Sequence, residues 1–366
     1  MISKHTASLK HAEHYANVIL LADQMYEKGG SGVEKGLKHF DDNWKNIELG
    51  QKWAAQISLY DEKAATLACE YPERGSHCLY LRQKPAERMN WLKTALQIAH
   101  LRGYELVEGT LHGKIGLAYA EMGEYQQAIE HYANRLKIAE RFNDLEGLGE
   151  GACNLGILYD SLDMLEPAQE CYQYALELAG QISNQKIFEV ATGNLGLIYL
   201  KREKFQEAIR YFERHLDLSK QNGDLWSESN ALTNLGIAFL KLGNFDGALS
   251  YFHQSISINQ KLGDLEGEAK NLGYIGTTMS SLGKLDDAVM AYQARIHLAQ
   301  KLNDPLGEAK GNWNLGKVLI EQQKYELGLE YLERCAQYEK AVGDPAWEED
   351  VEVIKMIEES LPQRKK

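Results

Sequence analysis

The stretch GNWNLGKV, residues 311–318, has the residue types and spacing that come closest to a chemical motif. Its two glycines and Lys317 match most of the phosphate-binding pattern G-x-x-x-x-G-K-[ST], in which backbone amides hold nucleotide phosphates and a hydroxyl holds Mg²⁺. Val318 stands where that hydroxyl is needed, and no β-branched run precedes Gly311 to form the required strand. We therefore expect no nucleotide to bind at this stretch.

The remaining candidates for catalysis or metal binding are weaker. His11 and His14 could bind a metal ion from one face of a helix, but the sequence indicates no third ligand. The sequence also contains no G-x-S-x-G motif, no zinc-ligand spacing and no cysteine with a recognisable base. We therefore predict a non-enzymatic protein without a metal site or cofactor. An unrecognised enzyme site in the first 60 residues stays open as an alternative.

The composition narrows the choice of partner and compartment. The 366-residue chain has a net charge of −13, which disfavours nucleic acid or an anionic membrane as its main partner. The five cysteines are odd in number and form no C-x-x-C pair, as expected for reduced thiols in a cytoplasmic protein. No stretch approaches the roughly 18 apolar residues of a membrane span, and the N-terminus does not look like a signal peptide.

The second glycine of the opening stretch belongs to a forty-residue period. An apolar residue precedes each copy of this glycine, a large apolar residue follows at +3, and five of the six copies have alanine at +12 and an aromatic residue at +16. A fixed period with matching residue types at several offsets indicates an array of structural repeats. The repeat glycines are Gly116, Gly156, Gly196, Gly236, Gly276 and Gly316.

Each repeat is predicted to contain two helices, A and B. Apolar or small residues follow helical spacing on both sides of a break such as Leu282-Gly283-Lys284. Glycine or asparagine at the end of helix B supplies a left-handed residue, and the aspartate that follows in five copies can cap the next helix. This pattern leaves no room for strands.

The pattern of Leu/Ile-Gly, Tyr, Ala and Tyr/Phe in a helix–turn–helix repeat resembles the tetratricopeptide repeat. The sequence from Asn234 to Gly273 is especially similar to the repeats of G-protein signalling modulators, kinesin light chains and the sensors of bacterial STAND ATPases. The resemblance implies an all-α, right-handed superhelix (an α-solenoid) of antiparallel helix pairs.

We predict four segments along the chain. Residues 1–63 form an atypical N-terminal helical cap, with the glycine-rich KGGSGVEKG as a flexible connection, and residues 64–105 form a degenerate repeat. Residues 106–345 form six forty-residue repeats, and residues 346–366 form a C-terminal capping helix and tail. In the degenerate repeat, helix A is expected near residues 69–81 and helix B near 88–101.

A superhelix of this type exposes its A helices on a concave face. At 100° per residue, offsets −6, −3, −2, +1 and +5 from the repeat glycine point away from the core, with +4 at the edge. Asparagine recurs at −2, and its amide can bind the backbone of a peptide of any sequence; the resemblance implies such an asparagine ladder. The predicted groove residues are Asn154, Asn194, Asn234, Asn314, Ile157, Leu197, Ile237, Lys201, Lys241, Lys270, Lys310 and Lys317.

Apolar residues and lysines in one groove suit a protein or peptide partner that has apolar anchors and some acidic residues. We therefore predict a cytoplasmic adaptor that binds such a segment in bacterial signalling or regulation. Three alternatives stay open. The asparagines and apolar residues could serve only packing, the chain could be a sensor that regulates a separately encoded enzyme, or its N-terminal helices could fill the groove of another copy.

Overall fold

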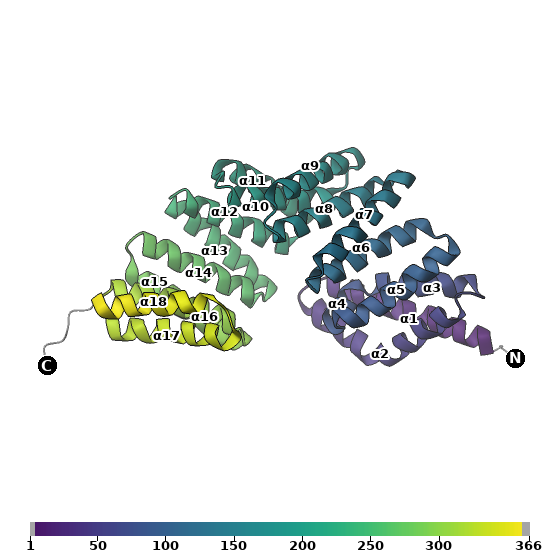
Figure 1. The fold of residues 1–366 in the computed structure, drawn as a ribbon, viewed down its shortest axis with the longest axis horizontal. Helices are drawn as coiled ribbons and strands as arrows, with labels where there is room; N and C mark the ends of the chain where they lie inside the picture. The colour runs from purple at the N-terminus through teal and green to yellow at the C-terminus, as the bar shows by residue number, and fades with distance from the viewer. Residues whose placement is uncertain (1–3, 361–366) are drawn as a thin grey trace. The chain divides into compact units, whose positions relative to one another are not determined.

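The computed structural model describes residues 4–360, and these residues form 18 α-helices and no strand (Figure 1). The predicted all-α class is therefore confirmed. None of the described helices has the length and apolar character needed to cross a bilayer. The chain divides into two compact units, unit 1 (Met1–Ile198) and unit 2 (Tyr199–Lys366), with the boundary inside helix α10. Each unit is described by itself.

Unit 1 begins with five helices that share one hydrophobic core. Phe40, Ile47 and Tyr71 are fully or almost fully buried there, and the Tyr71 hydroxyl donates a hydrogen bond to the Ala12 carbonyl over 2.8 Å. The apolar faces of the first two helices are thus occupied within the same chain. The five helices are α1 (Lys4–Glu27), α2 (Ser31–Ile57), α3 (Glu62–Arg74), α4 (Ser76–Arg82) and α5 (Pro85–Arg102).

Two details of this region differ from the prediction. The connection after α1 is short, because α2 already begins at Ser31 and includes most of the glycine-rich stretch. Helix A of the degenerate repeat is split into α3 and α4 at Gly75. A Cβ atom at Gly75 would overlap the side chain of Ile19, so glycine at the break lets α1 pack closely against it.

The predicted helix pairs follow in both units, and in every repeat helix A is shorter than helix B by one residue. In unit 1 they are α6 (Glu105–Glu121) with α7 (Tyr125–Phe142) and α8 (Leu145–Ser161) with α9 (Leu165–Ile182), followed by α10 (Gln185–Lys201). Unit 2 contains α11 (Phe205–Asn222), α12 (Leu225–Lys241), α13 (Phe245–Leu262), α14 (Leu265–Ser281), α15 (Leu285–Leu302), α16 (Pro305–Glu321), α17 (Tyr325–Val342) and the last helix, α18 (Ala346–Ser360).

The repeat glycine has a packing role. In the pair α8–α9, a Cβ atom at Gly156 would lie 2.6 Å from Cε1 of Tyr172, the aromatic residue at +16. The Tyr172 ring is 1% exposed, so it fills the space that the missing side chain leaves. Gly116, Gly236 and Gly276 approach the rings of Tyr132, Phe252 and Tyr292 in the same way, and Gly316 approaches Leu332. The period in the sequence is therefore a period of close helix contacts.

The helix ends follow the predicted capping chemistry. Asn143, Gly223, Gly263, Asn303 and Gly343 have positive φ at the end of helix B, as does Ser183. The side chains of Asp144, Asp224, Asp264 and Asp304 accept hydrogen bonds from backbone amides in the first turn of the next helix. Asn184 replaces aspartate in its copy and accepts from Ile187 N over 3.1 Å. These caps satisfy amides that lack a partner within the helix.

Candidate partner-binding surface

The two apparent chemical motifs have structural surroundings that explain them. GNWNLGKV lies inside α16 and forms no loop, so its likeness to a phosphate-binding motif is accidental. The rings of His11 and His14 both contact the ring of Tyr15, with centroid distances of 4.6 and 4.9 Å. Both histidines thus take part in aromatic contacts on α1.

The A-helix surface, defined as offsets −6, −3, −2, +1 and +5 from the repeat glycine, is hollowed in unit 1. A groove of about 360 Å³ lies there across α6, α8 and α10. The predicted residues Asn154 and Ile157 line it together with Leu117, Lys114 and Val190. Leu117 and Ile157 are 47% and 48% exposed, which is high for large aliphatic side chains. The groove therefore offers apolar side chains, an amide and charges of both signs on one surface, since glutamates line it as well as lysines.

The four predicted asparagines have the same degree of burial and the same lack of hydrogen bonds within the described part of the chain. Asn154, Asn194, Asn234 and Asn314 are each partly buried in the middle of an A helix. Among residues 4–360, their side-chain amides make no hydrogen bond with the protein, although each amide has two donor hydrogens and an acceptor. The structure therefore gives these amides no bonding role within the fold.

The other predicted residues fall into different surroundings. Ile237 is partly buried and packs against the core that contains Phe252, whereas Leu197 is partly buried on α10. Lys201 and Lys241 are exposed near the ends of their helices. Lys270 and Lys310 line a second cavity, of about 660 Å³, in unit 2. Apolar residues at +1 thus serve both the open surface and the core.

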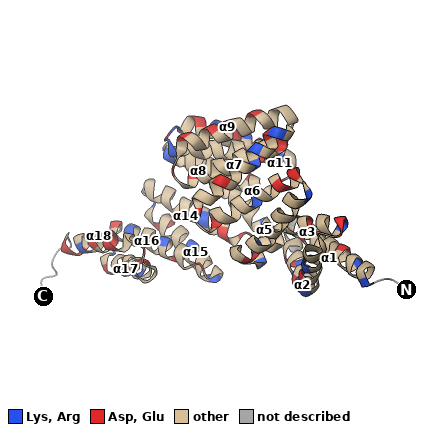
Figure 2. Cartoon of the chain, turned by 45° about the vertical axis from the view of Figure 1, so that its right-hand side comes forward, with Lys and Arg blue, Asp and Glu red and all other residues tan. Residues whose placement is uncertain are grey.

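Lys317 is exposed on α16, and its charge acts on Asp350 of the last helix, α18. Figure 2 shows acidic residues along α18, whereas basic and acidic residues are interspersed on the repeat helices. Lys317 therefore lies near acidic groups of the chain itself.

One position that the periodic core pattern does not single out is offset +19, on helix B. It carries Arg135, Ala175, His215, Ser255, Arg295 and Cys335. Arg295 is partly buried, and the other five are buried. The polarity of this position changes from one repeat to the next. The partners of Arg135 and Ser255 include residues of the A helices on either side, which the pattern of core residues does not reveal.

The partners at +19 differ in kind. Arg135 forms ion pairs with Asp144 (3.4 Å) and Glu150 (3.5 Å). Ser255 belongs to a buried hydrogen-bond network in which its hydroxyl lies 2.9 Å from that of Thr233 and accepts from the Asn271 amide over 3.0 Å. This network is satisfied within the core, as buried polar groups require.

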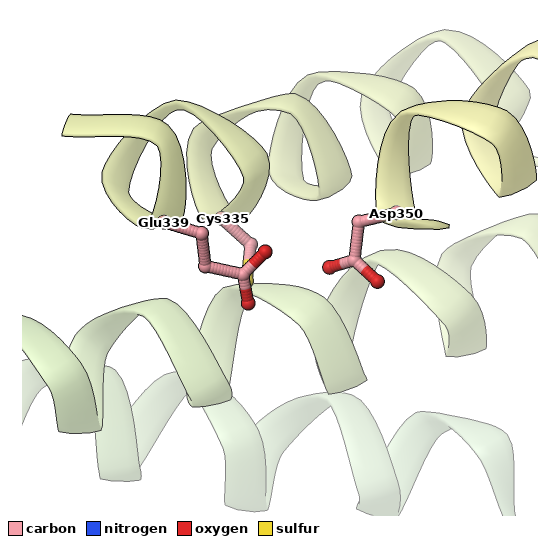
Figure 3. Close-up of side chains that lie close together, drawn as sticks. All are labelled: Cys335, Glu339 and Asp350. Atoms are coloured by element: carbon pink, nitrogen blue, oxygen red, sulfur yellow. The ribbon is translucent and has the colours of Figure 1, made fainter. Parts of the chain in front are cut away.

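Cys335 lies in a compact polar cluster with Glu339 of α17 and Asp350 of α18 (Figure 3). One atom from each of the three side chains lies within 4.8 Å of the others, and the Cys335 thiol donates to Glu339 over 3.4 Å. Burial and the nearby Glu339 carboxylate raise the pKa of Asp350 to about 6. Burial, helped by Glu339, raises the pKa of the Cys335 thiol to about 12, so the thiol is protonated and unreactive at neutral pH.

The helix pairs, their close contacts at glycine and their open A-helix surface are typical of helical-repeat proteins that bind other molecules. The sequence matches the tetratricopeptide repeat family over residues 107–181, 188–261 and 227–301, which together cover more than half of the chain. The chain therefore belongs to the tetratricopeptide repeat family, whose repeats are protein-interaction modules. No curated protein matches it in sequence.

Several solved structures have a similar fold. A STAND protein with a tetratricopeptide repeat sensor from Pyrococcus horikoshii is 16% identical with a TM-score of 0.64, and the match covers 89% of this chain and 49% of that one. A Rap protein in complex with Competence and Sporulation Factor is 14% identical with a TM-score of 0.54, over 96% and 97% of the two chains. BtubC from P. vanneervenii is 20% identical with a TM-score of 0.52, over 59% and 91%. At these identities the likeness concerns the fold.

Proposed function

We propose that the A-helix surface binds an extended or helical segment of a protein partner, and that the chain acts as a non-enzymatic adaptor. The observation that carries this proposal is the set of asparagine amides without a hydrogen-bond partner among the described residues, beside exposed Leu117 and Ile157. A mid-helix asparagine is a middling helix former, so a role outside the helix is the better explanation for it. The lysines nearby favour a segment with some acidic residues.

The spacing of the A helices suits an extended ligand. Neighbouring packed helices are about 10 Å apart, and an extended chain advances by about 3.3 Å per residue. One asparagine in each repeat would therefore meet every third residue of the segment. In unit 1, Asn154 and Asn194 occupy successive A helices and would hold the backbone, whereas Ile157 would contact apolar side chains.

The setting that we propose is bacterial signalling or regulation in the cytoplasm. The Rap protein whose fold is similar was solved with a bound factor, which supports a ligand-binding role for arrays of this kind. A second candidate is a sensor that binds a ligand or peptide and regulates a separately encoded enzyme. The likeness to the sensor-bearing STAND protein, which extends over 89% of this chain, favours that candidate.

The test begins with peptides selected for binding to the full chain from a random display library. We expect the double substitution Asn154→Ala and Asn194→Ala to lower the affinity for the selected peptide by about tenfold, because each lost amide contact contributes about 0.5–1.5 kcal/mol. Fluorescence anisotropy measures the affinity, and circular dichroism checks the fold. Asn90→Ala, on the exposed surface of α5, is the matched control. Equal affinity of the double variant and the wild type would show that the asparagines do not bind the ligand.

A further inference from the structure

The cavity of unit 2 is built around Arg295, at offset +19 on α15. It measures about 660 Å³ and is lined by Lys270 of α14 and Lys310 of α16 as well as by Arg295. A Cβ atom at Gly273 would overlap Nη1 of Arg295, so glycine at this point of α14 makes room for the guanidinium. The arginine is thus held between two A helices and lines the cavity.

Arg295 differs from Arg135, which occupies the same place in its own repeat. Arg135 is paired with Asp144 and Glu150. The position that corresponds to Glu150 beside Arg295 is occupied by Lys310, so a cation replaces the acidic partner. Within residues 4–360 the Arg295 guanidinium makes no hydrogen bond or ion pair.

Partial burial makes a charged Arg295 without a partner unfavourable in free energy. Burial lowers the pKa of Arg295, with Tyr292, Tyr274 and Asp304 as the groups that act in the opposite direction. Asp304 caps α16 by accepting from Gly307 N over 2.9 Å, but unlike Asp144, which caps α8 and also pairs with Arg135, it forms no ion pair with Arg295. A partly desolvated guanidinium with five donors and no acceptor is stabilised when an anion binds to it.

The charges around the cavity favour a particular anion. Three cationic side chains line it against two carboxylates, Glu266 and Asp304, which leaves an excess of one positive charge. A single carboxylate neutralises that excess, whereas a phosphate dianion would reverse it. Arginine also binds a carboxylate in a two-pronged geometry that adds specificity.

We propose that Arg295, Lys270 and Lys310 form a carboxylate-binding site that receives an acidic side chain of the partner segment. This inference rests on the proposed function for the source of the carboxylate, but the site itself can be tested without a partner. It assigns to unit 2 the selection of an acidic residue, a task separate from the backbone contacts proposed for the asparagines. Tyr274, which replaces asparagine at −2 in this repeat, lines the same cavity.

The probe is N-acetylglutamate α-amide, which carries one carboxylate, and its uncharged control is N-acetylglutamine α-amide. Nitrogen-15 NMR of the arginine side chains in the full chain follows the titration at constant ionic strength, and Arg295→Met assigns the Arg295 signal. We expect this signal to shift and saturate with the glutamate probe only. Inorganic phosphate at the same ionic strength should bind more weakly.

The decisive variant is Lys310→Glu, which recreates beside Arg295 the acidic partner that Arg135 has. This substitution should lower the affinity for the glutamate probe by at least about tenfold. Lys301→Glu makes the same charge change at an exposed lysine outside the cavity and should leave binding nearly unchanged. The proposal is overturned if both probes shift the signal alike, if phosphate binds more tightly, or if the two charge reversals have equal effects. None of these outcomes would affect the proposed binding of a segment in unit 1.

Discussion

At the scale of single residues, two glycines of the pair α8–α9 show how position decides the effect of a side chain. Gly156 faces Tyr172 so closely that a methyl group does not fit without movement of the buried ring. Gly180 lies inside α9 and is exposed, and no atom would lie within 4 Å of a methyl group added there. The same substitution at the two sites therefore separates packing from helix propensity.

We expect Gly156→Ala to destabilise the fold by about 1–3 kcal/mol, because an added methyl group overpacks a filled core. Gly180→Ala should stabilise the fold by about 0.5–1 kcal/mol, because alanine loses less backbone entropy than glycine in a helix. Urea denaturation followed by circular dichroism measures both changes. A Gly156→Ala variant that is as stable as the wild type, or more stable, would contradict the packing role that we assign to the repeat glycine.

A second residue-scale prediction concerns the cluster of Cys335, Glu339 and Asp350. The pKa of Asp350 is raised in the folded state to about 6, above its ordinary value of 3.8, so the folded state binds the proton more tightly than the unfolded state. This contribution to stability is present at low pH and is lost as the pH rises from about 4 to about 6. The docking of α18 on α17 should weaken over the same range.

Asp350→Asn removes this titration, so the variant should gain stability relative to the wild type as the pH rises from about 4 to about 7. Thermal denaturation at several pH values measures the difference. Glu348→Gln, at an exposed residue of α18, is the control and should not change the pH profile in this way. A constant difference between Asp350→Asn and the wild type across the range would mean that Asp350 does not titrate abnormally.

At the scale of the helices, the turns between helix A and helix B depend on residues with positive φ. Gly123, Gly243 and Gly283 occupy this position in three repeats, whereas Asp163, Glu203 and Gln323 occupy it in the others with φ of 57°, 58° and 62°. A residue with a side chain is strained in this conformation, and glycine is not. The turn is therefore less stable in the repeats that lack glycine.

Gln323→Gly should stabilise the turn between α16 and α17 by about 1 kcal/mol, because glycine relieves the left-handed conformation. The opposite exchange, Gly243→Gln in the turn after α12, should destabilise its repeat by a similar amount. Chemical denaturation of the two variants measures both effects. If Gln323→Gly were destabilising, the side chain of Gln323 would have a stabilising role that outweighs the backbone strain.

The helix pairs could be predicted from the sequence because each repeat uses the same short-range signals. Pairs like Gly156 and Tyr172 recur at a fixed spacing in successive repeats. An aspartate such as Asp264 marks the start of a helix A, because its side chain accepts a hydrogen bond from an amide that lacks a partner within the helix. The split of the degenerate helix A at Gly75 was not predicted, because it depends on Ile19 of α1, which lies far away in the sequence. Local pattern thus determines the repeats, and distant packing determines the exceptions.

The candidate site was predictable only in part. The angular spacing of an ideal helix placed Asn154 and Ile157 on one surface, and in the structure both line the groove of unit 1. The role of Arg295 was missed, because it depends on whether the next A helix supplies an acid, like Glu150, or a base, like Lys310. A comparison across repeats of offset +19 together with offset −6 of the next repeat would have revealed this exchange.

At the scale of the whole molecule, membership of the tetratricopeptide repeat family and the exposed A-helix surface support the proposal that a partner segment binds on that surface. Ile157 on the A-helix surface and Tyr174 on helix B are 48% and 42% exposed, so they offer equally accessible reporters of two different surfaces. Comparison of the two positions distinguishes binding at a specific site from non-specific binding.

The most direct measurement is photocrosslinking of the selected peptide to full-length chains that carry benzoylphenylalanine at position 157 or at position 174. We predict that the peptide crosslinks from position 157, and that excess unlabelled peptide suppresses the product. Position 174 should give only the background seen with a scrambled peptide. Efficient, competable crosslinking from position 174 and none from position 157 would contradict binding of the peptide on the A-helix surface.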